Sequence, residues 1–209
     1  MILQKIQNVL TQMYKLPLEC PLASYLLATP TGIQIGNPLG KEALVVRETP
    51  GAVEVGLYID PETTQNLEKH DPFKRLDKNN FADFCAAIEG VSHLLYFLFR
   101  AEKGETITEL ELELQADVDR FLLLCFLCHK SHEILPQEML HKLFDDVQFR
   151  KGLTRKTKER YLRANGWAAK FCSKLERNFL KNGNWRATLE TARTFYQRNH
   201  WEKIRYLTP

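Results

Sequence analysis

The chain has 209 residues, of which 44% are hydrophobic and 26% are charged. This length is enough to bury a core without metal or disulfide support, and the composition is that of an ordinary soluble globular protein. The longest uninterrupted apolar run, residues 121–128, is far shorter than the roughly 20 residues that a membrane span requires. We therefore expect a soluble protein and no membrane partner.

Cysteine usage and the N-terminal segment indicate a reducing compartment. The cysteines are odd in number and stand among apolar residues, at Cys20, Cys85, Cys125, Cys128 and Cys172. This pattern is typical of reduced thiols buried as small hydrophobic side chains. Residues 1–15 are amphipathic and lack the uninterrupted apolar region of a secretory signal. The sequence therefore predicts a cytoplasmic protein.

The formal net charge of +3 conceals a strong asymmetry along the chain. Residues 150–209 contain 16 of the 29 lysines and arginines but only four acidic residues, so they carry +12, whereas residues 1–149 carry −9. Two interpretations follow. Either the acidic and basic regions attract each other within the fold, or the basic region meets an external polyanion.

The first elements are a helix and short extended segments. Apolar residues at Ile2, Ile6, Leu10 and Met13 form a helical stripe that predicts a helix over 2–14, ended by the prolines that follow. Residues 25–28 and 32–35 are then expected to pair as a first β-hairpin.

A second hairpin over 43–59 is the clearest local signal. Pro50-Gly51 suits the central pair of a type II turn, because Pro presets φ and Gly accepts a positive φ. Pairing about this turn places Leu44 opposite Leu57 and Val46 opposite Val55 on one face, and Arg47 opposite Glu54 on the other. The alternation along residues 53–60 predicts one face on a core.

Helices are predicted for most of the remaining chain. Asp60 as N-cap and Pro61 as first residue begin a helix that runs to about Lys69. Residues 81–100 and 108–127 hold the longest apolar stretches and are expected to fold back on each other as a central helical hairpin, 80–128. Further helices are expected over 136–144, from Thr154 to a break at Asn165-Gly166, over 167–181 with Gly183 as C-cap, and over 185–199.

These elements predict the α+β class: a small antiparallel β-sheet with an N-terminal helix, packed on a larger all-α helical bundle. We expect a small α+β region over 1–78, which contains the hairpin 43–59. A helical region over 79–209 would follow, with the central pair at 80–128 and basic C-terminal helices at 150–209.

A first candidate site contains metal-binding side chains. Cys125, Cys128, His129 and His132 lie along one side of a predicted helix, and the first three match the C-x-x-C-H pattern of haem attachment. The apolar context favours core cysteines over haem, and four positions on one straight helix span too much length to surround a zinc ion. We therefore expect no bound cofactor.

A second candidate is a polar centre on the central helical pair. The first helix carries Glu89, His93 and Tyr96 within an apolar stretch, and the second carries Glu113 and Asp117. Antiparallel helices can bring such groups together, as metal-carboxylate bundles do. A mutual Glu89–His93 hydrogen bond, and a solvated acidic face over 109–119, explain the same residues structurally.

The third candidate is a nucleic-acid- or polyanion-binding surface in the basic C-terminal third. Lysines and arginines recur at helical spacing beside a stripe of aromatic residues that we interpret as core. Such a row suits phosphate neutralisation, although no known nucleic-acid-binding motif accompanies it. The residues that we expect to contribute are Arg155, Lys156, Arg163, Lys170, Lys174, Arg177 and Lys181.

The prediction of function rests on the opposite net charges of residues 1–149 and 150–209, and on the motifs that the sequence lacks. It contains no phosphate-binding glycine loop and no serine nucleophile elbow. The leading prediction is a non-enzymatic protein-interaction module, an adaptor or regulatory subunit of a larger complex, with another protein as partner. A nucleic-acid-binding protein is the alternative, and a metal- or haem-binding helical protein is the third hypothesis.

Overall fold

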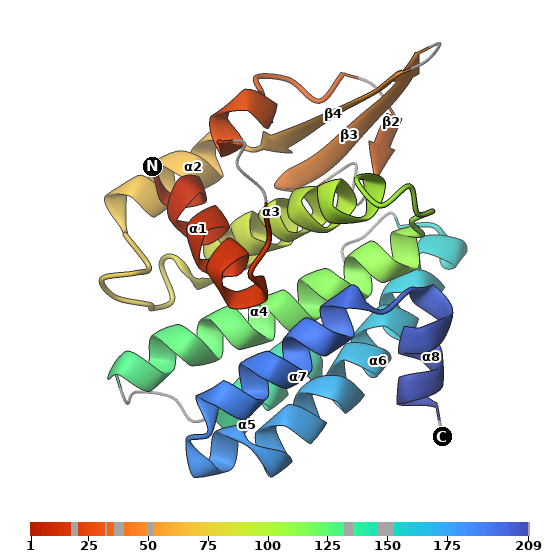
Figure 1. Ribbon diagram of the computed structural model, residues 1–209. Coiled ribbons are helices and arrows are strands. Elements are labelled where there is room, and N and C mark those ends of the chain that lie inside the picture. Colours follow the sequence, from red (N-terminus) through yellow and green to blue (C-terminus); the bar gives the residue numbers. More distant parts are fainter. Residues whose placement is uncertain are drawn as a thin grey trace. The chain divides into compact units, whose positions relative to one another are not determined.

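The computed structural model shows an α+β protein, as predicted (Figure 1). It describes residues 1–17, 21–31, 33–35, 40–49, 52–131, 136–145 and 153–208. The chain forms two compact units. The sheet unit comprises Met1–Gln12 and Leu16–Glu109, and the helical unit comprises Met13–Lys15 and Leu110–Pro209.

The sheet unit is built on the predicted hairpin. Strands β3 (Glu42–Thr49) and β4 (Ala52–Ile59) are antiparallel, with Leu44 opposite Leu57, Val46 opposite Val55 and Arg47 opposite Glu54. The register is therefore confirmed, whereas the Pro50-Gly51 turn lies outside the described residues. Leu57 and Ile59 are buried, but Val53 is 58% exposed, so only the half of β4 beyond Val53 faces a core.

The predicted first hairpin is wrong. After the 3₁₀ turn η1 (Leu22–Tyr25), the short strands β1 (Leu26–Leu27) and β2 (Ile33–Ile35) do not pair with each other. Instead, β1 lies parallel to β4 and β2 lies antiparallel to β3, which gives the order β1-β4-β3-β2. The sheet is therefore mixed rather than purely antiparallel, because each short strand completes the hydrogen bonds of one hairpin edge.

Helices accompany this sheet within its unit. Helix α1 (Ile2–Tyr14) has the predicted bounds. Helix α2 (Pro61–Lys69) begins as predicted, since the Asp60 carboxylate accepts a hydrogen bond from the Thr63 amide at 3.1 Å. Helix α3 (Phe81–Ala101) packs against β3, β4 and α2, and Figure 1 shows it running along the sheet.

Helix α3 is the one described helix whose length and hydropathy would suit a membrane span. Of that window, 56% is buried inside the protein. Residues such as Phe84, Ile88 and Leu94 are fully buried, and the helix contacts the sheet. These properties are those of a core helix.

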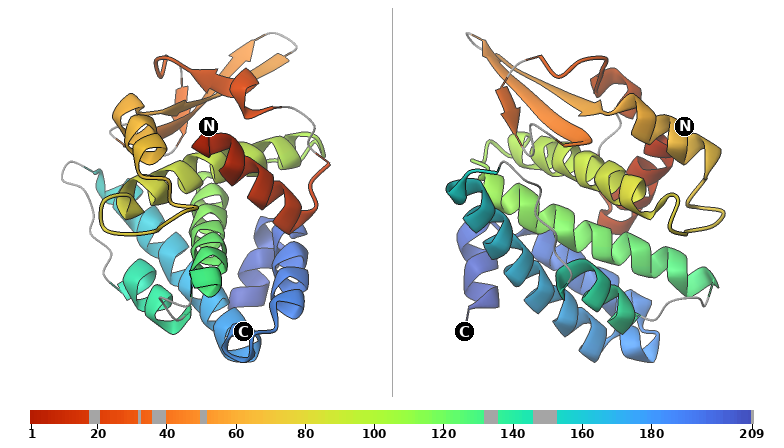
Figure 2. Two further views of the ribbon diagram at one scale, coloured as in Figure 1. Left: turned by 90° about the vertical axis from the view of Figure 1, so that its left-hand side faces the viewer. Right: turned by 180° about the vertical axis from the view of Figure 1, so that it is seen from behind.

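The helical unit contains α4 (Glu109–Ser131) and the basic C-terminal helices. Helix α5 (Pro136–Leu140) continues into a π-helical turn, η2 (His141–Asp145), and both contact α6 (Arg155–Asn178). The 3₁₀ turn η3 (Leu180–Asn182) connects α6 to α7 (Trp185–Gln197), and α8 (His200–Leu207) follows. Figure 2 shows α6 and α7 side by side, and Phe171 stacks on Phe195 between them.

Two helix boundaries differ from the prediction. Thr154 caps α6 as expected, but the helix continues through Asn165-Gly166 without a break, because its buried stripe of Ala164, Ala168 and Phe171 is uninterrupted. A further helix, α8, also follows the predicted last helix, because Asn199 and Glu202 form a capping box that begins it. The left-handed Gly183 (φ +66°) ends η3, as predicted.

The division into units also differs from the predicted boundary at 78/79. Helix α3 belongs to the sheet unit because it packs on β3, β4 and α2, and α4 belongs almost wholly to the helical unit. The expected central pair at 80–128 therefore contributes one helix to each unit. The last residues of α1 group with the helical unit.

Candidate functional site

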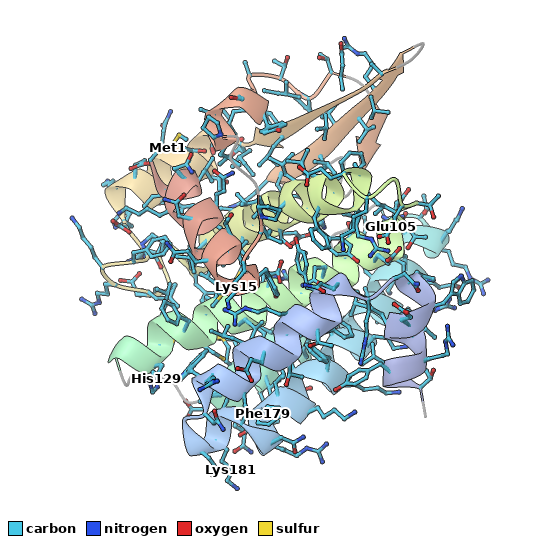
Figure 3. The ribbon with its side chains drawn as sticks, viewed as in Figure 1. Met1, Lys15, Glu105, His129, Phe179 and Lys181 are labelled. Atoms are coloured by element: carbon cyan, nitrogen blue, oxygen red, sulfur yellow. The ribbon has the colours of Figure 1, made fainter. Side chains whose placement is uncertain are left out.

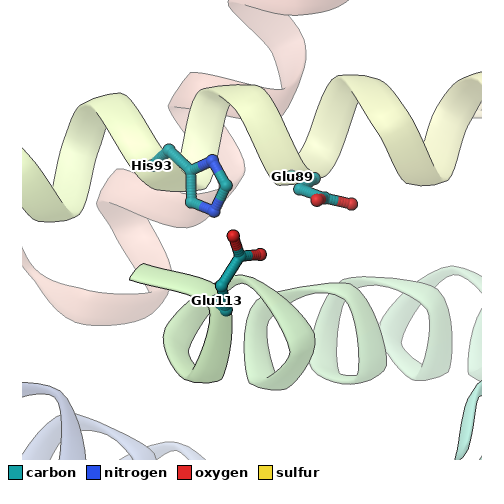
Figure 4. A group of neighbouring side chains, drawn as sticks. All are labelled: Glu89, His93 and Glu113. Atoms are coloured by element: carbon teal, nitrogen blue, oxygen red, sulfur yellow. The ribbon is translucent and has the colours of Figure 1, made fainter. Parts of the chain in front are cut away.

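The polar residues of α3 lie inside the sheet unit. Glu89 and His93 leave the same side of α3, one turn apart, as Figure 4 shows. The His93 side chain is fully buried, and its Nδ1 lies 3.5 Å from Oε2 of Glu42, a buried residue at the start of β3. Glu42 could not be identified from sequence spacing, because its position beside His93 depends on α3 packing against the sheet.

Tyr96 is part of the core of α3. It is fully buried, and the Arg100 guanidinium lies 5.8 Å from the centre of its ring. Arg100 is itself 1% exposed, and its Nη1 lies 2.7 Å from Oε2 of Glu105. Tyr96 therefore lies in the core beside a buried cation.

Glu113 and Asp117, the other members of the expected polar centre, belong to the helical unit. Glu113 leaves α4 (Figure 4), and its Oε1 lies 3.8 Å from Nη2 of Arg160 on α6. Asp117 pairs with Arg120 on its own helix. The five predicted residues are thus divided between the units, and a shared metal or catalytic role for them stays a prediction.

The acidic residues of α4 do not form a solvated face. Glu111, Glu113, Asp117 and Asp119 are each less than 9% exposed, so that interpretation is wrong for them. Helices α6 and α8 supply basic side chains that face these buried carboxylates: Arg160 faces Glu113, and His200 Nδ1 lies 3.7 Å from Glu111 Oε2. Part of the basic region therefore docks on acidic residues within its own unit.

A buried polar network lies deeper in the helical unit. The Tyr14 hydroxyl donates to Asp119, and Gln115 Nε2 donates to Asp119 Oδ1 at 2.8 Å. Lys203 of α8 is fully buried and donates from Nζ to Gln115 Oε1 at 2.8 Å. Burial, followed by the Asp119 charge, raises the pKa of Tyr14 well above its ordinary value, so its hydroxyl remains protonated at neutral pH.

The predicted cysteine–histidine site shows buried thiols and an exposed imidazole. Cys125 and Cys128 are buried, whereas His129 is exposed near the end of α4 (Figure 3) with its ring 5.4 Å from that of Trp185. Among the described residues these three do not form a converging set of metal ligands. His132 lies outside the described residues, so a metal site here stays a prediction.

Burial also controls the chemistry of the cysteines. It raises the pKa of the Cys125 and Cys172 thiols well above their ordinary value, because the thiolate would lose its hydration.

We expect iodoacetamide at pH 8 to label the half-buried Cys85 of the native protein well before either buried thiol. Peptide mass spectrometry at successive times measures the order. Equal labelling of all three sites in urea is the control, and early labelling of Cys172 would contradict this assignment.

All residues of the predicted polyanion-binding set are exposed in the structure. They follow α6 from its first turn to the 3₁₀ turn after it, and Lys181 lies at the surface near Phe179 (Figure 3). Arg155 pairs with Glu159 at 2.8 Å, whereas none of the other six forms an ion pair with a described residue. We call this set, Arg155, Lys156, Arg163, Lys170, Lys174, Arg177 and Lys181, the basic face.

A groove adjoins the middle of the basic face. It has a volume of about 650 Å³ and lies between α6 and α8. Tyr206 forms part of its wall, with Lys174 Nζ 4.3 Å and Arg198 Cζ 4.1 Å from the centre of the ring. The sequence did not predict this groove, because it predicted no α8. The capping pair Asn199 and Glu202 was the signal that could have revealed that helix.

The site is thus a surface of exposed cations beside a groove, supported by a buried polar network. A comparison of the chain with protein-family models, with curated proteins and with solved structures finds no match.

Proposed function

We propose that this chain is a binding module that engages nucleic acid through the basic face of α6. One observation carries the proposal: a continuous row of exposed lysines and arginines, six of which have no ion pair with any described residue. A helix rises about 1.5 Å per residue, so the 24 residues of α6 present these charges over about 36 Å. Each contact with a phosphate would release a condensed counterion and favour binding.

The burial of the acidic residues of α4 supports an external partner for the basic face. Glu111 and Glu113 face His200 and Arg160, so they are engaged elsewhere in the helical unit. The seven cations of the basic face remain exposed to solvent. A row of like charges repels itself, and a polyanion relieves that repulsion.

The proposal describes a binding protein rather than an enzyme, and it places the protein in the cytoplasm. The described cysteines, Cys85, Cys125, Cys128 and Cys172, are all free thiols, which suits a reducing compartment. No bound cofactor is part of the proposal.

Charge reversal on the basic face tests the proposal. The triple variant Lys170→Glu, Lys174→Glu and Arg177→Glu is expected to weaken binding of a fluorescein-labelled single-stranded RNA about 100-fold at low salt. The slope of log K against log salt concentration should fall in magnitude by about 2, since roughly 0.7 counterions are released per phosphate contact on a single strand. Fluorescence anisotropy across a salt series measures both quantities.

A triple variant of the sheet unit provides the matched control. Lys69, Lys74 and Lys78 are exposed, and their reversal to Glu changes the net charge by the same amount. We expect that control to retain most of the affinity. If both variants bind equally well, or if the charge-reversed basic face binds like the unmodified protein, the proposal is wrong.

A protein partner is the second candidate function, as an adaptor or regulatory subunit. Trp201 at the start of α8 is 69% exposed, and tryptophan is enriched among residues that dominate protein interfaces. Single-stranded and duplex oligonucleotides separate the two candidates. Binding of neither at low salt would favour the protein partner.

A further inference from the structure

The groove between α6 and α8 combines positive charge with an apolar wall. It lies within the helical unit, is open to solvent and has a volume of about 650 Å³. Helix α6 contributes charged and hydroxyl groups, and α8 contributes a ring and an aliphatic side chain. The lining includes Lys170, Ser173, Lys174, Arg177, Tyr206 and Leu207.

Two cations contact the ring of Tyr206, and one of them, Lys174, lines the groove. Lys174 Nζ lies 4.3 Å and Arg198 Cζ lies 4.1 Å from the centre of its ring, and attraction to the ring favours both positions. Lys174 also lines the groove, so its ammonium group can meet an anion there, together with Lys170 and Arg177.

The Tyr206 ring is itself fixed by the core of the helical unit. Its centre lies 6.0 Å from the ring centres of both Phe171 and Phe195, which stack on each other at 4.0 Å. The ring therefore has little freedom to turn away, and its contact with Lys174 favours one position of the ammonium group before a ligand arrives. A preorganised site loses less conformational entropy on binding.

We propose that this groove takes one nucleotide of a single-stranded nucleic acid. The phosphate would lie against Lys170, Lys174 and Arg177, with the Ser173 hydroxyl as a donor, and the sugar and base would cover the apolar side chains of α8. A base can enter only when it is unstacked from its neighbours, so the groove favours single strands over duplex. This inference rests on the proposed function and specifies its ligand.

A carboxylate introduced into the groove tests the inference with every cation left in place. Ser173→Asp is expected to weaken binding of a single-stranded RNA of about 12 nucleotides by about tenfold, because the new charge repels phosphate. Ser173→Asn has the same shape without the charge and should bind within about twofold of the unmodified protein. Thr194→Asp adds the same charge to the exposed part of α7 and should also have little effect.

The ring of Tyr206 is tested by a second pair of variants. Tyr206→Leu removes the ring that holds Lys174 and Arg198 and is expected to weaken single-strand binding about fivefold, with no change for a duplex of the same sequence. Tyr161→Leu is the matched control. Arg160 Cζ lies 5.4 Å from the centre of the Tyr161 ring, but Tyr161 does not line the groove. Tryptophan fluorescence during thermal unfolding confirms that each variant is folded at the temperature of measurement.

The outcomes distinguish this inference from the proposed function. Loss of single-strand binding in Ser173→Asp and Tyr206→Leu, but not in their controls, supports the groove. Tighter binding of duplex than of single strands, or full binding by Ser173→Asp, overturns the groove even if the charge-reversed basic face loses its affinity. If the charge-reversed basic face also binds normally, the proposed function fails together with the inference.

Discussion

Replacing Lys203 with Met is expected to lower the free energy of unfolding of the helical unit by about 3 kcal/mol. Lys203 is fully buried, and its ammonium group donates to Gln115 Oε1 at 2.8 Å while lying 4.9 Å from the Phe195 ring. Met retains most of the length of this side chain, and its thioether suits a contact with the aromatic ring. The loss therefore comes from the charge and from its hydrogen bond.

The reason for this cost lies in the rest of the network. Gln115 connects Lys203 to Asp119 and also donates to the Tyr14 hydroxyl at 3.3 Å. Replacing Lys203 removes the cation that Gln115 connects to the buried Asp119 carboxylate. A buried charge that loses its compensation typically destabilises a protein by 3–5 kcal/mol, on the order of the effect expected here.

The tryptophans make the measurement specific to the helical unit. Trp167, Trp185 and Trp201 all belong to that unit, and the sheet unit has none. Urea unfolding followed by tryptophan fluorescence therefore reports its stability. Arg205→Met is the matched control on the same helix, because Arg205 is exposed and should cost no more than about 0.5 kcal/mol.

A double variant identifies the source of the effect. If Lys203 compensates the charge of Asp119, then combining Lys203→Met with Asp119→Asn should cost less than the sum of the single changes, by about 1 kcal/mol or more. Strict additivity would show that Lys203 does not compensate the charge of Asp119. Equal unfolding midpoints for Lys203→Met and Arg205→Met would show that the buried ammonium contributes nothing.

The sequence predicted features that depend on neighbours along the chain. The bounds of α1, the Asp60 cap of α2, the left-handed Gly183 and the complete register of the β3–β4 hairpin follow from local spacing, and the structure confirms them. Each of these features is determined by residues within one or two turns or across one tight connection. Local chemistry was therefore sufficient.

Features that depend on contacts between distant segments were not predictable in this way. Strands β1 and β2 join opposite edges of the hairpin, although their sequence spacing suggested that they pair with each other. Lys203 resembles any other residue of the basic C-terminal region, yet it is buried beside Gln115, 88 positions away. Likewise, Glu42 faces His93 only because α3 packs on β3. Sequence spacing does not specify which helix covers which face.

The exposure of the basic face was easier to predict from the sequence than the arrangement of the candidate polar centre. All seven residues of the basic face are exposed, because charged side chains at helical spacing avoid burial unless a partner is present. The groove beside them could not be predicted without α8. That helix begins with the cap at residues 199–202, and the predicted helix over 185–199 ended on the same residues, so the cap was not recognised. The polar centre depended on pairing two helices that belong to different units.

Replacing Gly90 with Val is expected to destabilise the sheet unit by about 3 kcal/mol. Gly90 lies in the interior of α3 where this helix meets the sheet, and a Cβ there would stand 2.7 Å from Ile59 Cδ1 and 3.1 Å from both Glu42 Cβ and Leu57 Cδ1. The Ile59 methyl is the end of a flexible side chain and can move for Ala. The additional methyl groups of Val would also press on Glu42 and Leu57, whose positions the sheet fixes.

Gly166 provides the comparison because it also lies inside a long helix, α6, but no described atom would be within 4 Å of its Cβ. Gly166→Ala should stabilise the helical unit by up to about 1 kcal/mol through helix propensity alone. Gly90→Ala should stabilise the sheet unit much less, because the contact with Ile59 offsets the same gain in helix propensity.

Hydrogen exchange of peptides covering 42–59 and 81–101 measures the stability of the sheet unit, and tryptophan fluorescence measures the stability of the helical unit. If Gly90→Ala and Gly166→Ala stabilised their units equally, α3 would have to lie farther from the sheet than these distances allow. The position of Glu42 beside His93 would then have to be reconsidered as well.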